Sequence, residues 1–398
     1  MADIKNYLEE KEKREQAQLG YKEKIARHKM ATFYKVLLML AVLLILIIIV
    51  LVQYKRHVYT NYETIATVSR EMISGITDTR IGNAVLSYSK DGAHCTDAMG
   101  NVRWNQTFEI QDVKLDINGD TVAIGDYNGR SIYVANSEKL LGEITTNMPI
   151  RDIAVSQKGY VTAVLADTDV TWINTYNNNG ELLFYSQAHM DESGYPVDIS
   201  LSPNGELLCV SYVYVDAGVL KTNIGFFNFG PVGAERNDYL VSGFNYTDML
   251  IPYVRFMNDT TAFAVGDSRL MIFTGAHIPV TQEEHVLDRE IQAVYYSDKY
   301  IGLVFMSDNN ENRYQLNVYE PATSKKRIFY FDMDYTDVFF GKDYFVIYNE
   351  TSCQIVTMDG IVKFSGDFTQ NVRLMLPAGN TYKYLLITDD SIDTIQLR

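Results

Sequence analysis

The sequence predicts an all-β protein, an eight-bladed β-propeller preceded by a single transmembrane α-helix. Three observations lead to this prediction: a long apolar segment near the N-terminus, a hairpin pattern that recurs eight times behind it, and almost no helical periodicity among the recurring hairpins. Of 398 residues, 47% are apolar and 12% aromatic, mostly Tyr and Phe, which favour strands. The net charge of −15 repels nucleic acid, so we expect no nucleic-acid partner.

The apolar segment is expected to be a membrane anchor. Residues 36–52 are 17 consecutive apolar residues without charge, Gly or Pro, and the flanking aromatic and Gln residues lengthen the stretch to 21. As a helix this spans ~31 Å, enough to cross a bilayer. A buried core helix is the alternative, but such a helix seldom lacks a polar stripe over this length. The predicted anchor residues, including the side chains that would reach the two interfaces, are Phe33, Tyr34, Val36, Val52, Tyr54, Lys55 and Arg56.

Charge and flanking sequence predict the orientation of the chain. Gln-Tyr-Lys-Arg follows the segment in place of a small-residue cleavage site, which favours an uncleaved signal anchor over a signal peptide. Residues 1–35 hold nine Lys and Arg against six Asp and Glu, whereas the remainder holds 26 against 44. The positive-inside rule then predicts a cytoplasmic juxtamembrane helix (1–35), a transmembrane signal-anchor helix (36–54) and an extracytoplasmic β-propeller (57–398) at the cell membrane. Residues 1–35 would need a partner inside the cell to carry any signal.

The repeated hairpin is clearest in DISLSPNGELLCVSY (198–212), two alternating strands joined by Pro-Asn-Gly. Similar pairs recur at spacings of 37, 40, 46, 54, 40, 43 and 37 residues, which indicates repeated units. Their first strands are nearly all apolar, as expected for inner strands buried on both faces. The turns lie at or near Gly82, Gly119, Gly159, Gly205, Asp259, Lys299, Lys342 and Gly379.

A second pair of strands follows each hairpin, as in GAHCTDAMGNVRWNQTF, so each unit has four strands and is typical of a propeller blade. The last unit is one strand short, and residues 58–69 are expected to supply that strand and close the ring. Eight blades are counted; seven would result if the first hairpin were irregular. Tandem β-sandwiches are the alternative architecture.

In residues 91–107, DGAHCTDAMGNVRWNQT, the chain resembles the repeat of quinoprotein-like propellers, with Asp97, Gly100 and Trp104 in the matching places. Together with the single span, GYPVDISLSPNGELLCVSY and FFNFGPVG, the chain resembles an uncharacterised family of single-pass, membrane-anchored bacterial propellers of the quinoprotein-like and WD40-like superfamily. That resemblance implies a fold and an anchor, and no reaction. There are only two tryptophans and no adjacent cysteines, unlike the quinone-dependent enzymes, so Trp104 is expected to pack between blades.

The motifs predict no catalytic, cofactor-binding or metal-binding residue. Six histidines form no ligand motif, and three distant cysteines indicate neither a disulfide framework nor a zinc site. Residues 116–120 and 307–312 invite a Ca²⁺ interpretation, but Asp and Asn are equally expected in turns. Paired carboxylates that converge on the channel, as in a glycosidase, cannot be selected from the sequence.

The hypothesis from sequence is therefore a non-enzymatic scaffold at the bacterial cell envelope, with the lipid bilayer and an envelope protein or glycan as partners. The alternative is an anchored propeller enzyme, either a glycosidase or a quinone-dependent oxidoreductase. The largest insertion, residues 228–248 of the fourth unit, is rich in aromatics. An exposed aromatic patch there would mark a partner site, although FFNF is also a plausible strand. The candidate interaction residues are Phe226, Phe227, Phe229 and Phe244.

Overall fold

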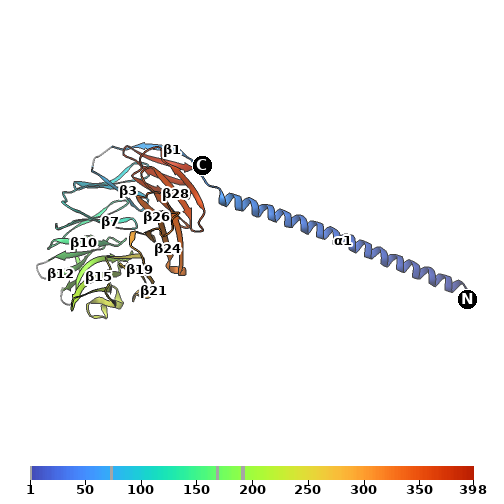
Figure 1. Cartoon of the computed structure of the whole chain (residues 1–398), viewed down its shortest axis with the longest axis horizontal. Helices are drawn as coiled ribbons and strands as arrows, with labels where there is room; N and C mark the ends of the chain where they lie inside the picture. Colours follow the sequence, from blue (N-terminus) through green and yellow to red (C-terminus); the bar gives the residue numbers. More distant parts are fainter. Residues whose placement is uncertain (1, 72–74, 167–169, 190–192) are drawn as a thin grey trace. The chain divides into compact units, whose positions relative to one another are not determined.

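The computed structural model describes residues 2–71, 75–166, 170–189 and 193–398. They form two compact units, residues 1–58 and 59–398. The first is a continuous helix, α1 (Ala2–Arg56), that covers both the predicted juxtamembrane and the predicted membrane-spanning segment (Figure 1). By length and composition α1 could cross a membrane: its most apolar 18-residue window has a mean hydropathy of 3.0, and none of that window is buried in the protein.

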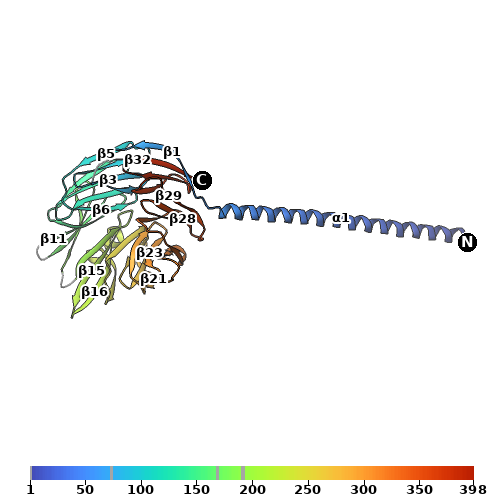
Figure 2. The same cartoon turned by 45° about the horizontal axis from the view of Figure 1, so that its top comes forward.

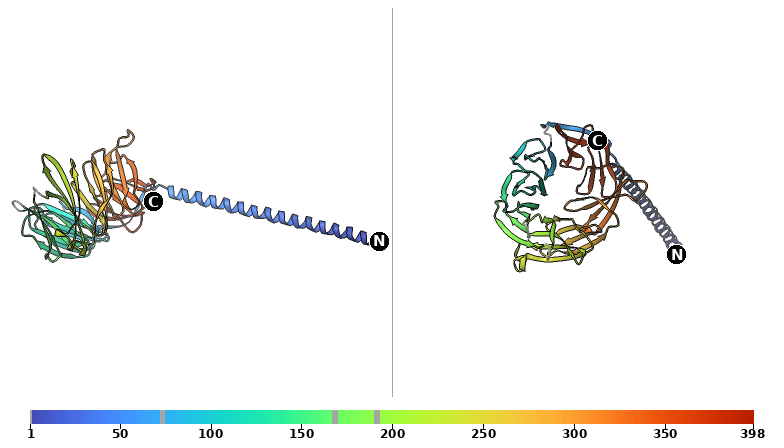
Figure 3. Two further views of the ribbon diagram at one scale, coloured as in Figure 1. Left: turned by 90° about the horizontal axis from the view of Figure 1, so that it is seen from below. Right: turned by 60° about the vertical axis from the view of Figure 1, so that its left-hand side comes forward.

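The second unit is a ring of eight four-stranded antiparallel sheets, as the sequence predicts (Figures 1 and 3). Blades 1 to 4 consist of β2 (Thr77–Ile81), β3 (Ala84–Tyr88), β4 (Gly92–Thr96) and β5 (Val102–Thr107); β6 (Val113–Asn118), β7 (Thr121–Asp126), β8 (Ser131–Asn136) and β9 (Leu140–Thr145); β10 (Ile150–Val155), β11 (Val161–Ala166), β12 (Thr171–Tyr176) and β13 (Leu182–Ala188); and β14 (Tyr195–Leu201), β15 (Leu207–Asp216), β16 (Val219–Asn228) and β17 (Leu240–Thr247).

Blades 5 to 8 consist of β18 (Tyr253–Asn258), β19 (Thr261–Val265), β20 (Arg269–Thr274) and β21 (Val280–Val286); β22 (Ile291–Tyr296), β23 (Ile301–Met306), β24 (Tyr314–Glu320) and β25 (Lys325–Phe331); β26 (Asp337–Phe340), β27 (Tyr344–Tyr348), β28 (Ser352–Thr357) and β29 (Val362–Asp367); and β30 (Leu374–Pro377), β31 (Lys383–Ile387), β32 (Ser391–Leu397) and β1 (Tyr62–Ser69). Short helices α2 (Pro231–Ala234) and η1 (Asn237–Tyr239) lie in the insertion of blade 4, and η2 (Pro321–Thr323) lies in blade 6.

The second strand of each blade forms the core, which corrects one expectation from the sequence. Strands such as β7, β11 and β23 bury five consecutive residues, because neighbouring blades cover both of their faces. The first strands are less apolar and carry charged residues in the middle, as in β6 and β14. Turn glycines allow the hairpins to pack closely: Gly205 has a φ of +73°, and a Cβ there would lie 2.5 Å from the Tyr160 ring.

The ring closes as predicted, because β1 pairs with β32 and completes the eighth blade (Figure 2). The antiparallel register runs from Tyr62 opposite Leu397 to Ser69 opposite Ser391. Just beyond β1, the Arg70 guanidinium donates to both carboxylate oxygens of Asp78 on the first strand of blade 1, at 2.9 and 3.0 Å. This bidentate pair holds the last blade against the first.

The two faces of the ring are defined by the connections between strands. The turn face carries the turns between the first and second strands and between the third and fourth strands of each blade. The linker face carries the remaining turns and the connections from blade to blade, because adjacent strands are antiparallel throughout. The chain enters the propeller on the turn face, where the Tyr59 N–H donates to Lys363 O (2.8 Å) and Asn61 exchanges backbone hydrogen bonds with Arg398.

Candidate functional site

The first strands of blades 2 to 5 bring a set of charged side chains together around the axis of the ring. This axial cluster consists of Lys114, Asp116, Asp152, Asp198 and Arg255. Lys114 Nζ lies 2.8 Å from Asp152 Oδ1, and Arg255 Nη1 lies 2.8 Å from Asp198 Oδ2. Asp116 has no cationic partner within ion-pair distance among the described residues. One oxygen of its carboxylate accepts a hydrogen bond from the Val155 N–H at 2.7 Å.

Burial makes Asp116 the most unusual acid of the axial cluster. The pKa of its carboxyl is raised to about 6, mainly by desolvation; Arg255 and the Val155 N–H oppose the rise, and the nearby Asp152 and Asp198 carboxylates add to it. Burial also raises the pKa of Asp198, against the lowering effects of Arg255 and the Val254 N–H. Asp116 is therefore a carboxyl group that changes its charge close to neutral pH.

The axial cluster also fastens consecutive blades to one another. Asp116 of blade 2 accepts from a backbone N–H of blade 3, and Asp198 of blade 4 accepts from the Val254 N–H of blade 5 at 2.6 Å. Ser200 repeats the arrangement by accepting from the Phe256 N–H at 2.9 Å. These contacts align the inner strands of neighbouring blades. The Asp116 carboxyl can in addition bind or release a proton. Sequence reasoning missed the cluster, although a charge in the middle of an otherwise apolar first strand marks it.

The linker face carries the two features most suited to docking a partner. The hairpin of β15 and β16 has ten residues in each strand, whereas the second strands of the other blades have five or six. Ala217 and Gly218 form its tip with positive φ angles, and Val215 beside the tip is 69% exposed. Between blades 5 and 6 lies a cavity of ≈ 550 Å³ whose lining includes Leu250, Pro252 and Ile291.

The predicted aromatic patch requires correction, because two of its four residues belong to the core. Phe226 is fully buried between blades 4 and 5, 5.2 Å from the Phe273 ring, and Phe227 is 6% exposed between blades 3 and 4. Phe229 and Phe244 are half-buried, and each packs against a core phenylalanine. The physical reason is that FFN ends strand β16, whose side chains point alternately into the two blade interfaces.

The predicted anchor residues all lie in α1. Phe33, Tyr34, Val36 and Val52 are exposed, at 63%, 60%, 52% and 44%, and Arg56 ends the helix. Tyr54 and Lys55 belong to the same helix, and their side chains lie outside the described part of the structure. Among the described residues, no group of three or more His, Cys, Asp or Glu side chains is arranged to hold a metal ion. The three cysteines are free and buried.

The closed ring of eight four-stranded sheets, preceded by one apolar helix that could span a membrane, defines the chain as a β-propeller protein. It belongs to DUF5711, a family of unknown function, whose sequence profile matches residues 55–397. This agrees with the sequence resemblance to an uncharacterised propeller family.

Comparison with solved structures also returns propellers. The fold is similar to the crystal structure of BamB from Moraxella catarrhalis, with 11% identity, 85% of this chain and 100% of that chain covered, and a TM-score of 0.50. It is also similar to Sqt1 from Chaetomium thermophilum, with 11% identity, the same coverage of both chains and a TM-score of 0.52. At this identity the likeness shows the fold alone. No curated protein matches the chain in sequence.

Proposed function

We propose that this protein is a membrane-anchored, extracytoplasmic β-propeller that acts as a non-enzymatic scaffold for a protein or glycan partner at the bacterial cell envelope. One observation carries the proposal: the apolar part of α1 is exposed on all sides. A helix window with a mean hydropathy of 3.0 and none of its surface buried needs an apolar environment that the propeller does not supply. The lipid bilayer is that environment.

The distribution of charge supports the orientation. The segment before the apolar stretch, residues 1–35, is net positive, and the chain that follows it is strongly negative. Positively charged flanks are retained in the cytoplasm, so residues 1–35 are cytoplasmic and the propeller is outside. Residues 36–54 form the span, with Tyr34 and Tyr54 at its interfaces and Lys55 and Arg56 at the headgroups.

The path of the chain indicates which face of the propeller is free for a partner. Only residues 57 and 58 separate Arg56 at the end of α1 from Tyr59, which is hydrogen-bonded on the turn face. The chain therefore joins the propeller on its turn face. The linker face, with the exposed tip of the β15–β16 hairpin and the apolar cavity between blades 5 and 6, is the recognition surface.

Site-specific photocrosslinking in living cells tests this proposal. A benzoylphenylalanine at Val215, on the linker-face hairpin, should give a discrete adduct with an envelope protein or glycan. The matched control places the same probe at Lys158, an exposed residue in the blade 3 turn of the turn face, where we expect no such adduct. Adducts of equal yield at both positions, or none at Val215, would contradict recognition through the linker face.

A glycosidase is the second candidate, because carboxylates from three blades meet in the axial cluster. Asp116 has a pKa of about 6, which suits a general acid, and two carboxyl groups are the minimum that glycoside hydrolysis needs. Hydrolysis of a glycan by the full chain, lost on Asp116→Asn substitution, would favour this function over the scaffold. The quinone-dependent alternative has less support, since Trp104 and Trp172 lie on β5 and β12, away from the inner strands.

A further inference from the structure

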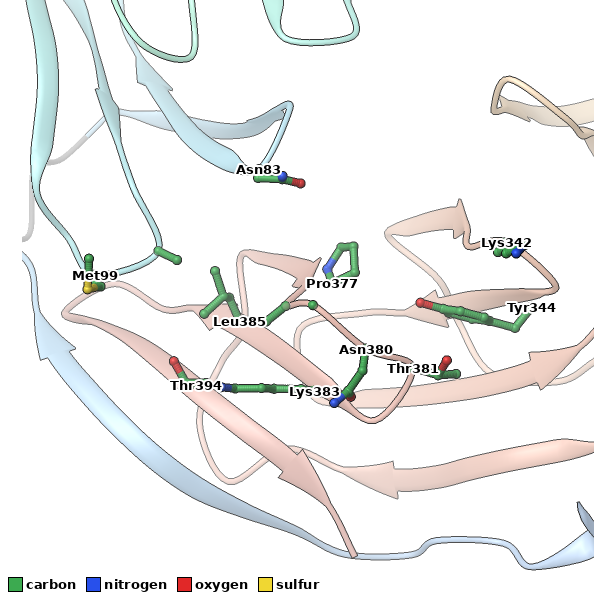
Figure 4. Close-up of a pocket in the computed structure, with 13 residues that line it drawn as sticks. Asn83, Met99, Lys342, Tyr344, Pro377, Asn380, Thr381, Lys383, Leu385 and Thr394 are labelled. Atoms are coloured by element: carbon green, nitrogen blue, oxygen red, sulfur yellow. The ribbon is translucent and has the colours of Figure 1, made fainter.

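The turn face carries a cavity at the place where the ring closes, built from blades 7, 8 and 1. Its volume is ≈ 760 Å³. Hairpin turns of all three blades form its walls, contributing Asn83 and Met99 from blade 1, Lys342 from blade 7 and Asn380 from blade 8. Figure 4 shows the Tyr344 hydroxyl and the Asn83 side chain turned toward this cavity from two sides.

Two lysines of the cavity have no acidic partner. Lys342 and Lys383 line the cavity, and neither makes an ion pair with a carboxylate of the described residues. Arg80 does not line the cavity, but its Nε donates to the Gly82 carbonyl (2.8 Å), next to Asn83 in the cavity wall, and it makes no ion pair among the described residues. In a chain of net charge −15, three unpaired cations around one cavity are unusual.

Two of the three acids that adjoin lining residues are paired with other cations, and the third, Asp393 beside Thr394, is buried. Asp343, which follows Lys342, lies 3.4 Å from Lys299 Nζ, and Asp97, which precedes the lining residues Ala98 and Met99, lies 3.6 Å from Arg103 Nε. The positive charge of Lys342 and Lys383 is therefore left for a ligand. Lysine ammonium groups are common binders of phosphate.

The remaining polar groups of the cavity add uncharged hydrogen-bond donors. Asn380 accepts from the Tyr382 N–H through Oδ1 (2.9 Å), which leaves its Nδ2 group to donate. Thr381 and Thr394 contribute hydroxyl groups. The volume lies within the range of about 300–1,000 Å³ typical of small-molecule sites, so a phosphate fits together with the glycerol or sugar to which it is esterified.

We infer that this cavity is a binding site for a phosphate ester, held by Lys342 and Lys383 at the closure of the ring. The ester is either the headgroup of an anionic phospholipid or a soluble glycerol or sugar phosphate. The site goes beyond the proposed scaffold function. Only its lipid source depends on the membrane anchor, because the turn face is where the chain enters the propeller.

The test uses the full chain in neutral detergent and measures dissociation constants by calorimetry. The soluble probes are inorganic phosphate and glycerol 3-phosphate, and the lipid probes are short-chain phosphatidylglycerol and, as the zwitterionic counterpart without net charge, phosphatidylcholine. Binding of a soluble probe, or of phosphatidylglycerol in preference to phosphatidylcholine, supports the site and identifies the source. Failure of every phosphate probe overturns it, and leaves the scaffold proposal to its own crosslinking test.

Variants connect binding to the two lysines. Lys342→Glu with Lys383→Glu should weaken binding at least about tenfold, because the charge-assisted hydrogen bonds from both lysines to the phosphate are replaced by repulsion. Lys342→Gln with Lys383→Gln keeps the shape without the charge and should also weaken binding, which covers the case in which charge reversal prevents folding. The matched control, Lys158→Glu, lies in the equivalent turn of blade 3 and should leave binding within twofold. Equal weakening in the control would overturn the assignment.

Discussion

Among individual residues, Asp116 has the clearest measurable consequence. Its carboxyl has an ordinary pKa near 3.8 in an unfolded chain, and burial raises the pKa to about 6 in the propeller. The folded state thus binds the proton more tightly than the unfolded chain. Stability is therefore highest at low pH with respect to this group, falls as the pH rises from about 4 to 6, and stays reduced at neutral pH.

Replacing Asp116 with Asn should stabilise the protein by about 2 kcal/mol more at pH 7.5 than at pH 4.5. The amide oxygen still accepts the Val155 N–H, while the buried negative charge is gone. The free energy of unfolding, measured for the full chain in neutral detergent at both pH values, checks this. Asp120→Asn, in the exposed turn of the same hairpin, is the control. A loss of stability at pH 7.5 would contradict this prediction and would show that attraction between the Asp116 carboxylate and the Arg255 guanidinium outweighs the cost of burial.

Among the strands, β5 shows how the outer part of a blade is fixed. Gly100 turns the chain with a φ of +77°, and four residues later Trp104 is buried and donates from Nε1 to the Asn136 carbonyl of blade 2, at 2.7 Å. The same spacing recurs as Gly180 to Phe184 and Gly360 to Phe364, both buried. The tryptophan is thus an inter-blade contact, as expected from the sequence.

Trp104→Phe should cost about 1–3 kcal/mol, because it removes a buried hydrogen bond and part of a ring from the interface between blades 1 and 2. The other tryptophan is a matched control: Trp172 Nε1 is buried without a partner among the described residues, so Trp172→Phe should be close to neutral. Denaturant unfolding of both variants gives the comparison. A larger loss for Trp172→Phe than for Trp104→Phe would refute the inter-blade role of Nε1.

The hairpins were predictable because each is specified locally. Pro-Asn-Gly at 203–205 fixes a turn, and the period-2 alternation on either side selects strands. Even the closing strand was predictable, because residues 58–69 supply a strand that the last unit lacks. The order of burial within a blade was not predicted, because the residues that bury each strand belong to neighbouring blades.

The candidate sites were much less predictable, because they combine residues from different blades. Lys114 and Asp152 meet only when blades 2 and 3 pack, and the phosphate-ester cavity needs the turns of blades 7, 8 and 1. The aromatic patch was predicted wrongly for a related reason. The composition of FFNF fits both a docking surface and a strand. Whether Phe226 is exposed or buried depends on the neighbouring blade that covers it.

At the scale of the whole molecule, we propose a closed propeller held outside the cell by one apolar helix. The ring buries its own core, with eight clusters distributed around the blades, whereas the apolar part of α1 is exposed. The net positive charge of residues 1–35 and the net negative charge of the remaining chain are the basis of the proposed orientation.

Cysteine accessibility in intact cells is the decisive measurement. All three native cysteines are buried, so a cysteine introduced at Val215 or at Ala17 reports its own surroundings. A membrane-impermeant maleimide should label Val215→Cys in intact cells and Ala17→Cys only after permeabilisation, with the full chain in the membrane fraction. Labelling of Ala17→Cys alone in intact cells, or recovery of the full chain without detergent, would contradict the anchored, outward-facing propeller.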